Sequence, residues 1–194
     1  VITSSMLTVI PMMQKEHKTF GPDDWFEPTA ETEAYTKSKV LAEKSAWDFV
    51  NSLPAEDKFE LVTVLPGLVI GPLIHGDGCS SQKLITNIVT GKIPGYYPIS
   101  LQIVDVRDVA KAHLLALYAP ANKRYICSAG TIPAVYMGKV ITDNFGKFGY
   151  PIPAVPEVLP ATAYDVDYTR TKEELKIDFR PIDSGIVDMV YSLI

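Results

Sequence analysis

Two groups of polar side chains have the types and spacing needed for proton transfer to a carbonyl oxygen. Thr3–Ser5 follows the short apolar pair Val1–Ile2, as polar residues do where a buried strand reaches its carboxyl end. Tyr35 and Lys39 are four residues apart, which on a helix places both on one face, one turn apart. Because an ammonium group beside a phenol favours the phenolate, Tyr35 is a candidate general acid. Ser5 could hydrogen-bond the same carbonyl oxygen.

The Tyr-x-x-x-Lys spacing is a weak signal by itself, since Tyr168 and Lys172 repeat it. Only the first copy is preceded by a Ser-rich strand end, and only the first is followed by a Pro-Gly strand exit, at Leu65–Pro72. We therefore predict that the first copy is catalytic and the second is not.

Hydrophobic patterns predict the elements that must position these residues. We predict strands at Val1–Ile2, Phe59–Leu65, Ile103–Val104 and Arg124–Ser128, the first, second and last of them buried, and helices at Ala34–Asn51 and Asp105–Tyr118. Segments 11–32 and 75–100 are polar or rich in Gly, Ser and Pro, which predicts loops. Strands that alternate with helices imply a parallel α/β sheet with right-handed crossovers.

The composition argues against several classes of function. The 194 residues are 47% hydrophobic and 21% charged, as in an ordinary globular domain. The net charge of −5, with Lys and Arg scattered, argues against nucleic acid as a partner. The longest apolar stretch, Leu61–Ile74, is interrupted by Pro and Gly and is shorter than the ~20 residues that cross a bilayer. We predict no membrane span, no required disulfide, and a cytoplasmic protein.

Five segments, in chain order, resemble the extended short-chain dehydrogenase/reductases of the NAD-dependent epimerase/dehydratase superfamily. These segments are Thr3–Ser5, Tyr35–Lys39, Ala42–Phe49, Leu65–Pro72 and Val104–His113. The sequence is most similar to the branch around dihydroflavonol reductase, cinnamoyl-CoA reductase and the fungal ketoreductases. The ordered resemblance runs from residue 1 almost to the carboxyl terminus, which makes it more specific than any single motif.

The resemblance implies a role for each matching residue. Ser5 polarises the substrate carbonyl, with Ser4 as the alternative, while Tyr35 donates the proton and Lys39 also holds the nicotinamide ribose. The residues that border the nicotinamide ring are Pro66, Leu68 and Val69. The implied cofactor is NADP(H). NAD(H) is not excluded, because the residues that distinguish the two belong to the nucleotide-binding half of such proteins, which this chain lacks.

The resemblance also implies the fold, which is the carboxyl-terminal part of a doubly wound, Rossmann-type parallel sheet with a small C-terminal substrate lobe. Residues 1–74 and 101–130 form the Rossmann-type part, residues 75–100 and 131–194 form the lobe, and the N-terminal nucleotide-binding half, with its Gly-rich turn, is absent. We expect the isolated chain to be inactive. Its first strand then has an unpaired edge, which favours self-association into a homo-oligomer.

These observations predict an NADP(H)-dependent oxidoreductase that reduces a small aldehyde or ketone to an alcohol. Two alternatives stay open. One is a nucleotide-sugar epimerase or dehydratase of the same superfamily, which uses the same Ser/Thr, Tyr and Lys. The other is a non-catalytic structural subunit derived from such an enzyme, which would have no need of Ser5, Tyr35 and Lys39 together.

The remaining polar residues have structural interpretations. His17, His75 and His113 are far apart and lack close ligand partners, so we predict no metal site. Cys127 lies in an apolar run and is predicted to be a buried core thiol. The carboxylates of the segment Asp105–Asp108 occupy the first turn of a predicted helix, where they are usually structural.

Overall fold

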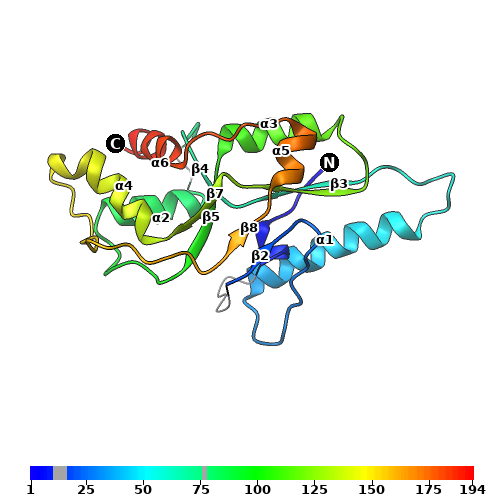
Figure 1. Cartoon of the computed structure of the whole chain (residues 1–194), viewed down its shortest axis with the longest axis horizontal. Coiled ribbons are helices and arrows are strands. Elements are labelled where there is room, and N and C mark those ends of the chain that lie inside the picture. Colours follow the sequence, from blue (N-terminus) through cyan, green and yellow to red (C-terminus); the bar gives the residue numbers. More distant parts are fainter. Residues whose placement is uncertain (11–16, 76–77) are drawn as a thin grey trace.

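The computed structural model describes residues 1–10, 17–75 and 78–194. Figure 1 shows α2, α4 and α6 gathered at one end of the molecule and α1 toward the other. The helices are η1 (Met6–Thr8), α1 (Ala34–Ser52), α2 (Ser80–Val89), α3 (Val106–Ala116), α4 (Val135–Phe145), η2 (Gly146–Phe148), α5 (Thr169–Leu175) and α6 (Ile182–Tyr191), where η marks a 3₁₀ helix. The strands are β1 (Ile2–Thr3), β2 (Thr19–Phe20), β3 (Val62–Pro66), β4 (Leu68–Ile70), β5 (Ser100–Asp105), β6 (Lys123–Cys127), β7 (Gly130–Pro133) and β8 (Asp165–Val166).

The strands form three small, mainly parallel sheets. One has the order β1-β3-β6 with all strands parallel, and a second is the parallel pair β2-β8. The third has the order β4-β5-β7, in which β4 and β5 are parallel and β7 is antiparallel to β5. The predicted α/β organisation is confirmed, with β7 as an antiparallel addition. A return after β6 through Gly130, whose φ is +150°, makes this antiparallel pairing possible.

The predicted helices at Ala34–Asn51 and Asp105–Tyr118 are confirmed as α1 and α3, with Asp105 as the N-cap of α3. Two strand predictions need correction. The strand predicted from Phe59 begins at Val62, and the Phe59 side chain is 53% exposed. β1 pairs with β3 but is not buried, because Ile2 is 40% exposed, which agrees with the unpaired edge predicted for the first strand.

Both predicted loop segments contain regular structure. Segment 75–100 includes α2, which buries Ile85, Ile88 and Val89 on one face, and the polar and Gly-rich flanks had obscured that helical spacing. Segment 11–32 includes β2, which can be recognised only from its pairing with β8, far along the chain. Residues 11–16 of that prediction lie outside the described residues.

The β1-β3-β6 sheet is covered on both faces because side chains alternate along each strand. Val62 and Val64 of β3 pack with Tyr125 and Cys127 of β6 in the core that includes residues of α3. On the opposite face, Leu65 and Ile126 pack against η1, β2 and β8. Figure 1 shows α3 and α5 on one side of these strands and α1 on the other. This layering places α1 beside the carboxyl end of β1.

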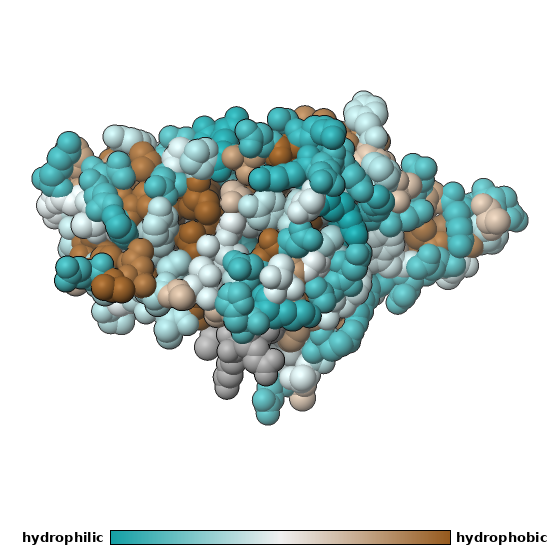
Figure 2. Space-filling model, in the orientation of Figure 1, coloured by the Kyte–Doolittle hydropathy of each residue, from teal (hydrophilic) through white to brown (hydrophobic). Residues whose placement is uncertain are grey.

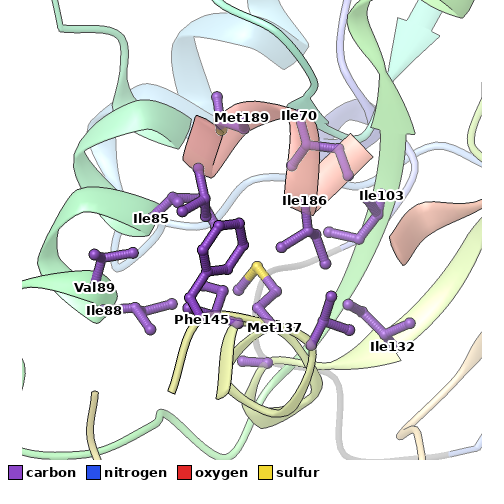
Figure 3. Close-up of a cluster of buried hydrophobic side chains, with 14 residues drawn as sticks. Ile70, Ile85, Ile88, Val89, Ile103, Ile132, Met137, Phe145, Ile186 and Met189 are labelled. Atoms are coloured by element: carbon purple, nitrogen blue, oxygen red, sulfur yellow. The ribbon is translucent and has the colours of Figure 1, made fainter. Parts of the chain in front are cut away.

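A separate core fills the end of the molecule that contains α2, α4 and α6. Figure 3 shows Phe145 and Met137 of α4 between Ile85 of α2 and Ile186 of α6. Full burial of an aliphatic or aromatic side chain contributes about 1.5–3 kcal/mol, so this cluster can hold the three helices against β4, β5 and β7. The face in Figure 2 is mostly hydrophilic, with its most extensive hydrophobic areas over α2 and α4. Among the described helices, none combines the length and apolar character needed to cross a membrane.

We expect the two cysteines to differ sharply in reactivity. Both thiols are free, but Cys79 is exposed, whereas burial and the nearby Asp108 carboxylate raise the pKa of Cys127 to about 12. At pH 8 only about one Cys127 in ten thousand is then a thiolate, the reactive form. Iodoacetamide should therefore modify Cys79 and spare Cys127 until denaturant is added. Peptide mass spectrometry checks this, and modification of Cys127 in the folded protein would contradict the described core.

Candidate active site

A cavity of about 440 Å³ lies where the carboxyl ends of β1 and β3 meet the start of α1 and the start of α2. It is lined mainly by apolar atoms, with hydroxyl and amide groups from several elements. The lining residues are Ser5, Met6, Leu7, Ile10, Tyr35, Pro66, Gly67, Leu68, Val69, Ser80, Ser81, Ser100, Leu101, Gln102 and Tyr164. The cavity thus brings together five of the six residues predicted from the sequence.

Tyr35 is held at the cavity by the way α1 begins. The Glu33 carboxylate caps the helix, accepting hydrogen bonds from the backbone N–H of Tyr35 at 2.9 Å and of Thr36 at 3.0 Å. These two amides hold the pKa of Glu33 below its usual value, so the cap is ionised at neutral pH. The Tyr35 side chain is 54% exposed, which leaves its phenol accessible from the cavity.

Lys39 is the one predicted site residue that is not in the cavity lining, as far as the described residues go. It lies one helical turn behind Tyr35, with its Nζ 5.9 Å from the centroid of the Tyr35 ring. The structure thus places the predicted cation next to the phenol, on the same face of α1.

Ser5 and Ser4 have different environments. Ser5 lines the cavity, and its Oγ accepts a hydrogen bond from the Leu7 amide at 3.2 Å, a contact that does not use the hydroxyl proton. The Ser4 Oγ is buried and donates its proton to Glu43 Oε2 at 2.5 Å. Of the two serines, Ser5 is therefore the one placed to donate to a ligand.

Pro66, Leu68 and Val69 form the apolar side of the cavity, at the step from β3 to β4. Gly67 lies between the two strands and packs directly on β5. A Cβ at this position would lie 2.5 Å from the carbonyl oxygen of Gln102, closer than any real contact, so only glycine fits.

Five polar lining residues were missed by the sequence analysis: Ser80 and Ser81 at the start of α2, Ser100 and Gln102 on β5, and Tyr164 before β8. Tyr164 donates to the Ser100 carbonyl at 3.0 Å, and burial raises the pKa of its hydroxyl. The Gln102 side chain lies near that hydroxyl, yet its buried Nε2 has no hydrogen-bond partner within the described part of the chain. No local motif marks these residues, because they meet only through the fold.

The groups given structural roles from the sequence lie elsewhere. Tyr168 of the second Tyr-x-x-x-Lys copy packs on Phe179, with ring centroids 5.8 Å apart. Nη2 of Arg107 lies 2.7 Å from Oδ2 of Asp105 and 2.6 Å from Oδ2 of Asp188. These two ion pairs link α3 to α6. Over residues 1–10, 17–75 and 78–194, no group of three or more His, Cys, Asp or Glu side chains could hold a metal ion.

Parallel strands covered by helices on both faces define a Rossmann-type α/β protein, as predicted. The solved structure of a yeast methylglyoxal/isovaleraldehyde reductase complexed with NADPH has the same fold, with a TM-score of 0.84 and 28% identity over 98% of this chain and 62% of that one.

Two curated relatives cover the whole chain. An uncharacterized oxidoreductase of Saccharomyces cerevisiae is 31% identical, and a ketoreductase of Aspergillus niger is 30% identical. No family model matches the sequence. The chain spans 62% of the length of each of these two relatives. The resemblance to reductases predicted from the sequence is confirmed.

Proposed function

We propose that the protein is an NADP(H)-dependent oxidoreductase that reduces a small aldehyde or ketone to an alcohol. One observation carries the proposal: Ser5 and Tyr35 line the same cavity from separate elements, with Lys39 directly behind the phenol. Ser5 and Tyr35 reach one cavity although Tyr35 lies 30 positions after Ser5 in the chain, so the fold and not their local spacing brings them together. Their convergence matches the requirements of proton donation to a carbonyl oxygen.

In this proposal each side chain has one task. The Ser5 hydroxyl donates a hydrogen bond to the substrate carbonyl oxygen and orients it. Tyr35 transfers its phenolic proton to that oxygen as the C=O bond becomes a C–OH group. Lys39 stabilises the phenolate left behind. NADPH, when bound, supplies the hydride that the carbonyl carbon receives.

The residues around the cavity fit a nicotinamide cofactor. Pro66, Leu68 and Val69 form an apolar wall against which the flat nicotinamide ring would pack. The Lys39 ammonium lies beside the Tyr35 ring, where it would donate hydrogen bonds to the ribose hydroxyls. NADP(H) is the proposed cofactor because the yeast reductase with this fold was crystallised with NADPH. NAD(H) is the alternative.

We further propose that residues 1–74 and 101–130 form the cofactor side of the site and residues 75–100 and 131–194 form the substrate side. The cavity lining supports this division. Ser5, Tyr35 and Val69 come from the first group, whereas Ser80 and Tyr164 come from the second, so that a carbonyl compound would lie between them.

The test is a screen of NADPH oxidation by the complete protein against small aldehydes, ketones and nucleotide sugars, repeated with NADH. We expect turnover with aldehydes or ketones and a preference for NADPH. Conversion of a nucleotide sugar without net NADPH consumption would instead identify an epimerase. Absence of all turnover, in a protein that still binds NADPH, would favour the structural subunit.

A further inference from the structure

A buried carboxylate lies two helical turns after Tyr35, between α1 and the sheet. The Glu43 side chain is 2% exposed and accepts hydrogen bonds at both oxygens. Oε1 accepts from Thr63 at 2.8 Å and from Trp47 at 3.3 Å, and Oε2 accepts from Ser4 at 2.5 Å. Arg124 completes the set with bonds of 2.8 Å and 3.2 Å, one to each oxygen. Both oxygens of the Glu43 carboxylate are buried away from water, and each accepts at least two hydrogen bonds within the protein.

Arg124, the cation of this pair, uses all five of its N–H donors. Nε and one N–H of Nη2 bind Glu43, and the second N–H of Nη2 donates to Thr8 Oγ1 at 2.8 Å. Nη1 donates to the carbonyl oxygens of Pro22 at 2.8 Å and Asp24 at 2.6 Å. A planar guanidinium with five fixed directions determines the positions of its partners closely.

Burial by itself disfavours the Glu43 carboxylate, but the hydrogen bonds and the charge of Arg124 outweigh that effect and hold the pKa of Glu43 below its usual value. The pair is therefore ionised at neutral pH. A buried ion pair is seldom more stabilising than apolar side chains of the same size. Its hydrogen bonds do, however, fix the positions of the groups bound to Glu43 and Arg124.

The partners of the ion pair flank Ser5 on both sides. Ser4, which precedes it, is bound to Glu43, and Thr8, which follows it, is bound to Arg124. Thr8 also donates from Oγ1 to the Ser5 carbonyl oxygen at 2.8 Å. The turn that carries Ser5 is thus joined at two points to the helix that carries Tyr35 and Lys39.

We propose that Glu43 is a positioning residue, which fixes the Ser5 hydroxyl relative to Tyr35 and Lys39 by binding Ser4 directly and Thr8 through Arg124. The inference rests on the proposed function, in which Ser5 and Tyr35 act on one oxygen atom. Glu43 touches neither substrate nor cofactor in this proposal. It acts by keeping two donors from different elements at a constant separation.

The test compares Glu43→Gln with Asp108→Asn in the complete protein. Asp108 is a matched control, since it is fully buried, is paired with Arg180, and belongs to α3 on the other side of the sheet. We expect Glu43→Gln to lower kcat about 10- to 100-fold with an unchanged Kd for NADPH, because a displacement of about 1 Å between reacting groups costs on the order of 100-fold. Asp108→Asn should lower the melting temperature and, when assayed well below it, leave kcat near wild type.

A second readout does not depend on activity. The amides of Leu7 and Thr8 donate to the Ser5 side chain and carbonyl, so their hydrogen exchange reports on this turn. In Glu43→Gln we expect both amides to exchange about tenfold faster, and in Asp108→Asn we expect them to keep their wild-type rates. If the wild-type protein reduces no carbonyl compound, the proposed function fails, and this exchange measurement still decides the role of Glu43.

Ser4→Ala serves if Glu43→Gln does not fold, because it removes one link to the turn and leaves the ion pair intact. A severalfold loss of kcat with wild-type affinity for NADPH supports the proposal. The proposal is overturned if kcat and the exchange of Leu7 and Thr8 stay at wild-type values in the folded variant. It is also overturned if Asp108→Asn changes them as much as Glu43→Gln does.

Discussion

Replacing Tyr35 with Phe in the complete protein is expected to lower kcat for carbonyl reduction by at least ~100-fold, the usual scale for loss of a general acid. The substitution removes only the hydroxyl. The cap by Glu33 binds the backbone of Tyr35 and Thr36, so it survives, and α1 should keep its position. Affinity for NADPH should stay close to wild type, because the ring and Lys39 remain. Steady-state kinetics and calorimetric titration with NADPH measure the two quantities separately.

Tyr168→Phe is the matched control, since Tyr168 has the same spacing to a lysine and lies outside the cavity lining. Its ring packs on Phe179, a contact that Phe preserves. This variant should turn over like the wild type. Wild-type kcat in Tyr35→Phe would show that another group supplies the proton, and equal losses in both variants would point to a general effect on folding.

Replacing Lys39 with Met is expected to weaken both NADPH binding and turnover. Hydrogen bonds to a charged group contribute about 1.5–3 kcal/mol, so the Kd for NADPH should rise by about tenfold or more. Turnover should also fall, because the phenolate that Tyr35 becomes after it donates its proton loses the ammonium that lies 5.9 Å from its ring.

Lys172→Met is the control for this second prediction, because its Nζ lies over the ring of Tyr168 at a similar 5.1 Å. Its NADPH affinity and kcat should match those of the wild type. If Lys39→Met keeps the wild-type Kd for NADPH, Lys39 does not hold the cofactor, and a loss of kcat alone would restrict its role to the phenol.

The elements that the sequence predicted well are those with strong local patterns. α1 and α3 have long runs of helix formers and a side-chain cap, β3 lies in a mainly apolar stretch whose residues are all buried, and β6 contains the buried run Tyr125–Cys127. α2 was missed because its ten residues lie between Gly-rich and Pro-rich stretches. The exposed edge of β1 was predicted from the resemblance and not from its residues, whose apolar character alone predicts a buried strand.

The candidate site was predictable only in its local part. Ser5, Tyr35 and Lys39 are marked by spacing and by resemblance, and the fold brings them together. No motif identifies Gln102, because this cavity residue lies on β5, whose sequence predicts a buried core strand. Glu43 resembles a solvated helix residue until the fold brings it to Arg124, 81 residues away. Residues that come together only through tertiary contacts show no periodic pattern in the sequence.

The glycine between β3 and β4 also bears on how ligands reach the cavity. The chain passes from one sheet to the other through the single residue Gly67, whose backbone packs on β5 and donates to the Cys127 carbonyl at 3.1 Å. Because this junction is packed so closely, we expect it to resist bending and the two sheets to move together. We therefore expect substrate entry and product exit to depend on local motion of the opposite wall, where the first turn of α2 and the segment around Tyr164 border the cavity.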